Sequence, residues 1–118
     1  MNTQAKILIA DDSAFMRKVL VDVLTTAGFS NFVECANGTE ALAKYASEKP
    51  DLCLFDIVMP EMTGLDALKK IGSEAKVLMI SAVGQENMIN EAKQNGAKGY
   101  IVKPFDNKQV LEEIAKVL

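Results

Sequence analysis

The sequence of 118 residues contains no histidine and no tryptophan, and it has only two cysteines and three prolines. The absence of histidine excludes this side chain as a general base, a metal ligand or a phosphate carrier within the chain. Cys35 and Cys53 each lie within an apolar run, so we interpret both as small buried side chains and not as a disulfide or a metal pair. Any catalytic or metal-binding chemistry must therefore use carboxylates, hydroxyls or amines.

Long hydrophobic segments and a strong charge of either sign are also missing. No apolar stretch reaches the ~18 residues that a membrane-spanning helix needs, and the N-terminal MNTQAK lacks the apolar segment of a signal peptide. The net charge of −3 argues against a nucleic-acid partner, because such a partner requires a basic face. We therefore expect a cytoplasmic protein that binds neither membranes nor nucleic acids.

The length and the composition suit one globular domain. A chain of 118 residues with 49% hydrophobic and 25% charged residues is long enough to form a substantial core. The sequence contains no recognisable linker, repeat or low-complexity segment, so we expect residues 1–118 to form a single domain and the protein to be a monomer.

Patterns typical of strands and of helices alternate from end to end. Short apolar runs predict the strands, and amphipathic segments predict the helices. The predicted strands are 6–11, 32–36, 51–56, 76–81 and 99–103, and the predicted helices are 13–28, 38–49, 63–72, 85–96 and 107–118. Five strand–helix units favour a parallel sheet covered on both faces. We therefore predict an α/β fold, a five-stranded, doubly wound, flavodoxin-like three-layer sandwich.

Polar side chains stand at the carboxyl ends of four predicted strands, where sheets of this kind bind ligands. They are Asp11, Asp12, Asp56, Ser81 and Lys103. Three carboxylates at one edge would repel one another unless a cation lies between them, and carboxylate oxygens suit Mg²⁺. Lys103 adds a positive charge and Ser81 adds a hydroxyl. The cluster predicts a site that stabilises a phosphoryl group during transfer, with Asp56 as the nucleophile.

Each of these residues also has a structural interpretation when it is taken alone. The DDS at 11–13 could simply cap a helix, and Lys103 with Pro104 could form an ordinary turn. Independent structural causes, however, would not place all of these groups at one edge of the sheet. Their joint placement therefore favours a functional site.

Four segments carry a resemblance to a known family. They are ILIADDSAFMRKVL (7–20), DLCLFDIVMPEMTG (51–64), MISAVGQ (79–85) and GYIVKPF (99–105). Together they resemble the receiver domain of two-component response regulators, and the similarity extends over essentially the whole chain. Within that family the chain is most similar to the stand-alone chemotaxis response regulators. The resemblance implies a flavodoxin-like fold and strand order 2-1-3-4-5.

The resemblance also implies a function. The chain would accept a phosphoryl group from the phosphohistidine of a histidine kinase onto Asp56, with Mg²⁺, and would catalyse its own phosphorylation and dephosphorylation. It would act on no external substrate. No output domain follows the last predicted helix, so a separate partner, such as the flagellar motor switch or an adaptor, would read its state. The fourth helix, the fifth strand and the fifth helix would form the surface for that partner.

Individual roles carry over by position. Asp11, Asp12, Asp56 and the backbone carbonyl of Val58 match the Mg²⁺ ligands. Ser81 and Lys103 match the residues that contact the acyl phosphate. These roles are implied by the resemblance alone.

Two further features follow from the same match. Tyr100 matches the aromatic switch residue, which turns inward when Ser81 is drawn to the phosphate, and the Lys103–Pro104 peptide is expected to be cis. Val58 and Val83 are apolar where members of the family often carry polar groups, so the resemblance does not fix the lifetime of the phosphorylated state.

Three alternative functions differ from this interpretation in the sequence features that they require. A Mg²⁺-dependent aspartyl-phosphate phosphatase would need a D-x-D pattern after the first strand, which ADDSA lacks, and a cap insertion. A flavodoxin-like cofactor carrier would need a phosphate loop rich in serine, threonine or glycine, and DDSAF is acidic instead. A receiver that serves as a phosphorelay intermediate, outside chemotaxis, stays open.

Overall fold

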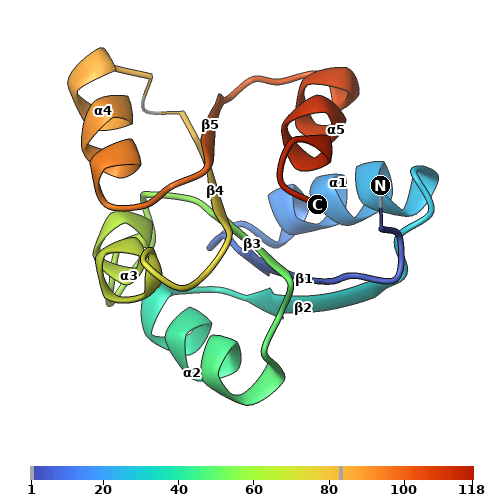
Figure 1. Cartoon of the computed structure of the whole chain (residues 1–118), viewed down its shortest axis with the longest axis horizontal. Helices are drawn as coiled ribbons and strands as arrows, with labels where there is room; N and C mark the ends of the chain where they lie inside the picture. The colour runs from blue at the N-terminus through green and yellow to red at the C-terminus, as the bar shows by residue number, and fades with distance from the viewer. Residues whose placement is uncertain (1, 83) are drawn as a thin grey trace.

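Within the residues that the structure describes, 2–82 and 84–118, five strands alternate with five helices, as the sequence predicts (Figure 1). The structure is a computed structural model. Its elements are β1 (Lys6–Ala10), α1 (Ala14–Thr26), β2 (Asn31–Cys35), α2 (Gly38–Glu48), β3 (Leu52–Phe55), α3 (Gly64–Ile71), β4 (Val77–Ser81), α4 (Glu86–Gln94), β5 (Gly99–Val102) and α5 (Asn107–Ala115).

At several ends the predicted ranges are longer than these elements by one to three residues, because they include helix caps and the polar residues that follow β1, β3 and β5, and the predicted strand 32–36 is shifted by one residue from β2. Ser13, for example, is the N-cap of α1, and its side chain accepts a hydrogen bond from the backbone N–H of Met16. Asp56 and Lys103 lie directly after β3 and β5 and not within them. This difference matters for function, since a side chain beyond the strand end can reach the loops.

All strand pairs are parallel, and the order in the sheet is β2-β1-β3-β4-β5. The chain therefore moves outward from β1 to β2 and then reverses to β3, which lies on the other side of β1. Such a reversal leaves a crevice at the carboxyl ends of the two central strands. The predicted fold and strand order are both confirmed.

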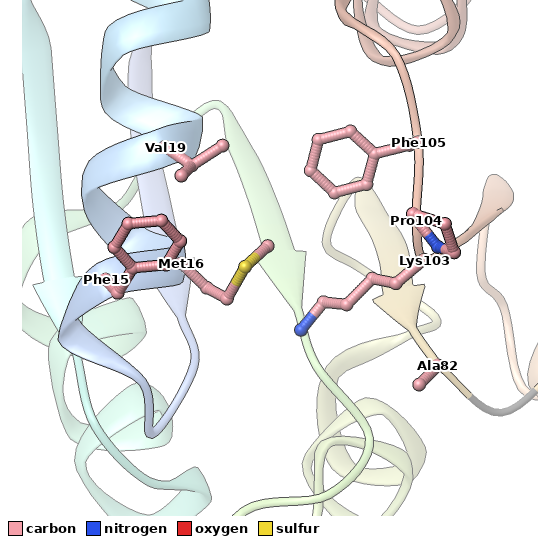
Figure 2. A pocket seen from close by; sticks show the side chains of 7 residues that line it. All are labelled: Phe15, Met16, Val19, Ala82, Lys103, Pro104 and Phe105. Atoms are coloured by element: carbon pink, nitrogen blue, oxygen red, sulfur yellow. The ribbon is translucent and has the colours of Figure 1, made fainter.

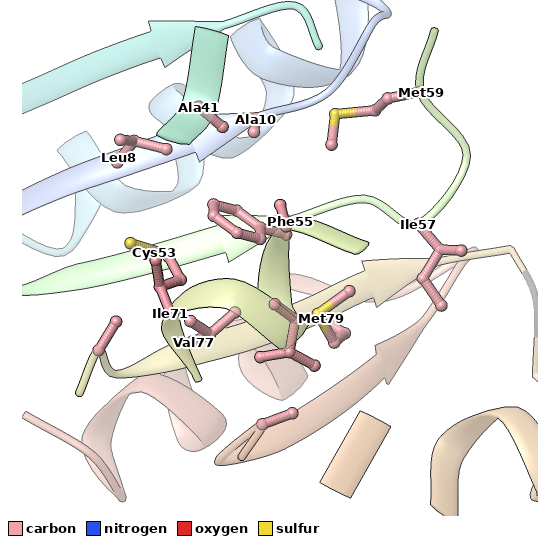
Figure 3. Packing of buried hydrophobic residues seen from close by; sticks show 14 of the residues in the cluster. Leu8, Ala10, Ala41, Cys53, Phe55, Ile57, Met59, Ile71, Val77 and Met79 are labelled. Atoms are coloured by element: carbon pink, nitrogen blue, oxygen red, sulfur yellow. The ribbon is translucent and has the colours of Figure 1, made fainter. Parts of the chain in front are cut away.

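Two apolar cores lie on the two faces of the sheet. In Figure 1, α1 and α5 cover one face, and α2, α3 and α4 cover the other. Alternation along β1 sends Leu8 to the α2–α3–α4 face and Ile7 and Ile9 to the opposite face. Figure 3 shows the first of these clusters, in which Phe55 and Met79 pack between the sheet and the helices.

Both cysteines are buried and free, as predicted. Burial raises the pKa of the Cys53 thiol to about 12 and that of the Cys35 thiol to about 11, so both thiols stay protonated at neutral pH. Among the helices of the described residues, none combines the length and the apolar character required to cross a membrane.

Candidate functional site

The structure brings three of the predicted residues into direct contact at the carboxyl edge of the sheet. The Lys103 ammonium group lies 2.9 Å from a carboxylate oxygen of Asp11 and 3.1 Å from one of Asp56. Asp11 is 2% exposed and Asp56 is 8% exposed. A buried carboxylate requires a partner, and here one lysine serves both.

Asp12 completes an acidic cluster. Carboxylate oxygens of Asp11, Asp12 and Asp56 lie within 4.8 Å of one another, while Asp12 itself is exposed to solvent. Three carboxylate oxygens this close together, one of them from an exposed residue, suit a hard divalent cation that keeps some of its water. The residues present therefore fit a Mg²⁺ site. The backbone carbonyl of Val58 as a further ligand stays a prediction.

Burial and the partner groups in this cluster have opposing effects on the pKa values of Asp56 and Lys103. Burial raises the pKa of Asp56 and outweighs the hydrogen bond and the charge of Lys103, which lower it, while the neighbouring charge of Asp11 raises it further. Burial alone would lower the pKa of Lys103, but the hydrogen bonds to Asp11 and Asp56 and the negative charges of these two carboxylates together outweigh burial and raise that pKa. Lys103 thus stays protonated, and the cluster gains from a further cation when all its carboxylates are ionised.

A close backbone approach fixes the loop that carries Asp56. A Cβ atom at Gly64 would lie only 1.8 Å from the backbone oxygen of Asp56, so any larger residue would displace the acceptor. The backbone N–H of Gly64 donates to the carbonyl of Ile57 at 2.9 Å, and that of Asp56 donates to the carbonyl of Ala10 at 2.9 Å. The N-terminus of α3 therefore holds Asp56 against the end of β1.

An apolar pocket opens beside Lys103 (Figure 2). Its volume is about 410 Å³, and its lining consists of Phe15, Met16, Val19, Ala82, Lys103, Pro104 and Phe105. Figure 2 shows the Lys103 side chain extending toward the end of β3, where Asp56 follows. Phe15 is 73% exposed at the rim. The Lys103–Pro104 peptide is cis, as the resemblance implies.

Ser81 and Tyr100 lie on neighbouring strands and contact each other. Ser81 is buried at the end of β4, and its side chain is hydrogen-bonded to Tyr100. Burial raises the pKa of Tyr100 and outweighs the hydrogen bond from Ser81, which lowers it. The half-buried Tyr100 ring packs against the core on the α2–α3–α4 face. An inward turn of Tyr100 on phosphorylation stays a prediction.

Two apolar residues, Val58 and Val83, follow Asp56 and Ser81 by two positions each. Val58 follows the acceptor by two residues, and its side chain is exposed. Its backbone N–H donates to a carboxylate oxygen of Asp56 at 3.3 Å. Val83 lies outside the described residues.

Comparison with known proteins identifies the family. The sequence model of the response regulator receiver domain matches residues 7–115. The chain belongs to this family. It is 49% identical over 115 residues to the chemotaxis protein CheY of Thermotoga maritima, covering 95% of this chain and 96% of that protein. It is 48% identical over 116 residues to CheY of Bacillus subtilis, covering 96% and 97%.

A solved structure agrees with the sequence relatives. The receiver resembles a chain in the CheX–CheY–BeF₃–Mg²⁺ complex of Borrelia burgdorferi with a TM-score of 0.92 and 38% identity, covering 96% of this chain and 88% of that one. The chain is thus a CheY-like response regulator of the chemotaxis type in sequence and in fold.

The sequence analysis does not predict the contacts that two residues, Gly64 and Arg17, make at this site. Gly64 is predicted to break the chain after the third strand and to lie in the first turn of a helix, but a glycine eight residues after a strand-end aspartate can also signal a close backbone approach. Arg17 was read only as part of a helix, yet its guanidinium group donates to the backbone carbonyl of Asp11 at 2.6 Å. No local pattern signals that contact, because it depends on how α1 sits on the sheet.

Proposed function

We propose that this chain is a chemotaxis response regulator in which Asp56 accepts a phosphoryl group from the phosphohistidine of a histidine kinase. The observation that carries the proposal is the position of Asp56, whose carboxylate contacts the Lys103 ammonium group and has an oxygen within 4.8 Å of carboxylate oxygens of Asp11 and Asp12. The acidic cluster supports Mg²⁺ as the cofactor. Relatives named as chemotaxis proteins, which match this chain over 95–96% of its length, support the pathway.

In the proposed reaction an oxygen of the Asp56 carboxylate attacks phosphorus. A P–O bond forms, the P–N bond of the phosphohistidine breaks, and the released imidazole keeps the electron pair and takes up a proton. Lys103, which contacts the carboxylates of Asp11 and Asp56, would shift its ammonium group toward a phosphoryl oxygen. Bound between the carboxylates of Asp11, Asp12 and Asp56, Mg²⁺ would neutralise charge on the phosphoryl oxygens.

The proposed output surface comprises α4, β5 and α5. A hollow of about 310 Å³ lies over β5 and α5, and its lining consists of Tyr100, Ile101, Val102, Gln109, Glu112, Glu113 and Lys116. Tyr100 belongs both to this hollow and to the hydrogen bond with Ser81. A downstream protein that binds here would therefore contact a residue that interacts with Ser81, the residue proposed to contact the phosphoryl group.

The test uses acetyl phosphate as the phosphoryl donor, with Mg²⁺, and mass spectrometry of the intact protein. We expect a single acid-labile phosphoryl adduct on the parent chain and none on Asp56→Asn, which keeps the size of the side chain. Asp66→Asn removes an exposed carboxylate from the first turn of α3 and should be phosphorylated like the parent. An undiminished adduct on Asp56→Asn would show that Asp56 is not the acceptor.

A further inference from the structure

The Arg17 side chain connects the β1–α1 loop to the edge strand β2. Its Nη1 group donates to the backbone oxygen of Asp11 at 2.6 Å, and its Nε group donates to a carboxylate oxygen of Glu34 at 3.0 Å. The side chain of Arg17 is 18% exposed and that of Glu34 is 49% exposed. The guanidinium group is therefore largely withdrawn from water and held at two points by its planar fork of donors.

The carbonyl that Arg17 binds belongs to the peptide that joins Asp11 to Asp12. Its orientation therefore helps to set the direction in which both carboxylates leave the backbone. The other polar groups of Asp11 are also engaged: its N–H donates to the carbonyl of Cys35 at 3.1 Å, and its carboxylate accepts from the N–H of Ser13 at 2.9 Å and from Lys103. Asp12 is exposed, so its position depends mainly on the backbone that Arg17 holds.

The far end of the bridge has a fixed place in the sheet. Glu34 pairs with Ile9 in the register of β1 and β2. Alternation along β2 places Cys35 in the core on the α2–α3–α4 face and Phe32 on the opposite face, so Glu34 projects toward α1. The bridge therefore ties the acidic loop to the rigid sheet and not to another loop.

By its charge alone, Arg17 opposes a cation site. A guanidinium group one hydrogen bond from the backbone of Asp11 repels a divalent ion held by Asp11 and Asp12. Its removal should tighten the binding of Mg²⁺ if charge were its only contribution. A role in orienting the carboxylates predicts the opposite sign, and this difference makes the two interpretations separable.

We propose that Arg17 is a positioning residue of the metal site, which sets the affinity of the Asp11–Asp12 pair for Mg²⁺ by bridging the Asp11 carbonyl to Glu34. The inference rests on the proposed function, which supplies the metal. Partners that orient metal ligands in this way typically change metal affinity by roughly 10–100-fold when they are removed.

The experiment is a calorimetric titration of the full chain with Mg²⁺, with no phosphoryl donor present. We expect Arg17→Met, which keeps the apolar stem, to bind Mg²⁺ about tenfold more weakly than the parent. Arg17→Lys keeps the charge but not the two-point bridge, and its affinity should lie between the two. Lys18→Met is the matched control, because it removes the same charge from an exposed neighbour that pairs with Asp22; its affinity should equal or exceed that of the parent.

A second measurement separates the bridge from simple charge effects. Glu34→Gln alone should weaken Mg²⁺ binding, but in the Arg17→Met background it should add nothing, since the bridge is already broken. Additive losses would overturn the proposal, as would equal or tighter binding by Arg17→Met. If the parent itself fails to bind Mg²⁺, the metal site of the proposed function is wrong and the inference falls with it, so the two failures are distinguishable.

Discussion

The proposed nucleophile, the ionised Asp56 carboxylate, is disfavoured by its own burial. Burial makes its ionised form costly, and the Lys103 ammonium group, which is shared with Asp11, compensates only part of that cost. An ionised Asp56 is nevertheless required for attack on phosphorus. The free energy that favours binding of Mg²⁺ and of a phosphoryl group therefore derives in part from relief of this unfavourable charge arrangement.

This penalty should appear as a pH-dependent difference in stability. The pKa of Asp56 is raised in the folded state, so the unfolded chain releases the proton at lower pH, and the folded state loses stability as the pH rises from about 4 through the folded pKa. Asp56→Asn lacks this loss. In metal-free buffer its free energy of unfolding should exceed that of the parent by an amount that grows with pH over this window and then levels off.

Urea denaturation at several pH values, with and without Mg²⁺, measures this difference. Asp66→Asn serves as the control for loss of one negative charge. Addition of Mg²⁺ should stabilise the parent far more than Asp56→Asn. A difference between Asp56→Asn and the parent that stays constant or shrinks as the pH rises would contradict the assignment of the penalty to Asp56.

The sequence could predict residues at strand ends better than contacts between layers. Asp11, Asp56 and Lys103 meet at one edge because the carboxyl ends of parallel strands share it, and that rule needs only the strand pattern. The bridge from Arg17 to Glu34 depends on how α1 packs on an edge strand, and no one-dimensional pattern encodes that packing. The same limit applied to the hydrogen bond between Ser81 and Tyr100.

The ends of α3 and α4 meet through their backbones. A Cβ atom at Gly72 would lie 2.0 Å from the carbonyl oxygen of Asn95, and one at Gly96 would lie 2.3 Å from the carbonyl oxygen of Gly72. At its other end, α4 has Gln85 as its N-cap, and the side chain of Gln85 makes no capping hydrogen bond. The C-terminal end of α4 is therefore fixed against the C-terminal end of α3.

Gly96 and Gly28 form a matched pair for testing this contact. Both have a positive φ, +103° and +105°, which costs a residue with a Cβ atom roughly 1–2 kcal/mol. At Gly28 a new Cβ atom would meet the movable side chain of Thr3 at 3.2 Å, whereas at Gly96 it would meet backbone. We expect Gly28→Ala to lower the free energy of unfolding by about 1–2 kcal/mol and Gly96→Ala to lower it by about 3 kcal/mol or more. Urea denaturation would measure both, and equal losses would show that the contact between the two helix ends can relax.

At the scale of the whole molecule, the sheet connects the two proposed surfaces, the acidic pocket and the output surface. The acidic pocket lies at the carboxyl ends of β1 and β3, and the proposed output surface lies over β5 and α5. Ser81 and Tyr100 lie between them: Met79 pairs with Tyr100 and Ser81 with Val102 in the register of β4 and β5, so both side chains point to the same face. Strand alternation and the crossover rules predicted the layers correctly, but they could not place the Tyr100 ring, whose rotamer depends on local packing.

The hydrogen bond between Ser81 and Tyr100 competes with the proposed use of Ser81 by the phosphoryl group. If the Ser81 hydroxyl must leave Tyr100 to contact a phosphoryl oxygen, the bond to Tyr100 opposes phosphorylation. Tyr100→Phe removes the competing partner and keeps the ring. One neutral hydrogen bond contributes about 0.5–1.5 kcal/mol, so the variant should bind the phosphoryl mimic BeF₃⁻, with Mg²⁺ present, about two- to tenfold more tightly than the parent. Tyr45→Phe is the control: it changes the other tyrosine of the chain, which lies on α2, and should bind like the parent.

Amide chemical shifts recorded during a titration with BeF₃⁻ measure the affinity. The shifts of α4 and β5 report whether the change reaches the output surface. Equal affinities of Tyr100→Phe and Tyr45→Phe would mean that Ser81 does not exchange one partner for the other.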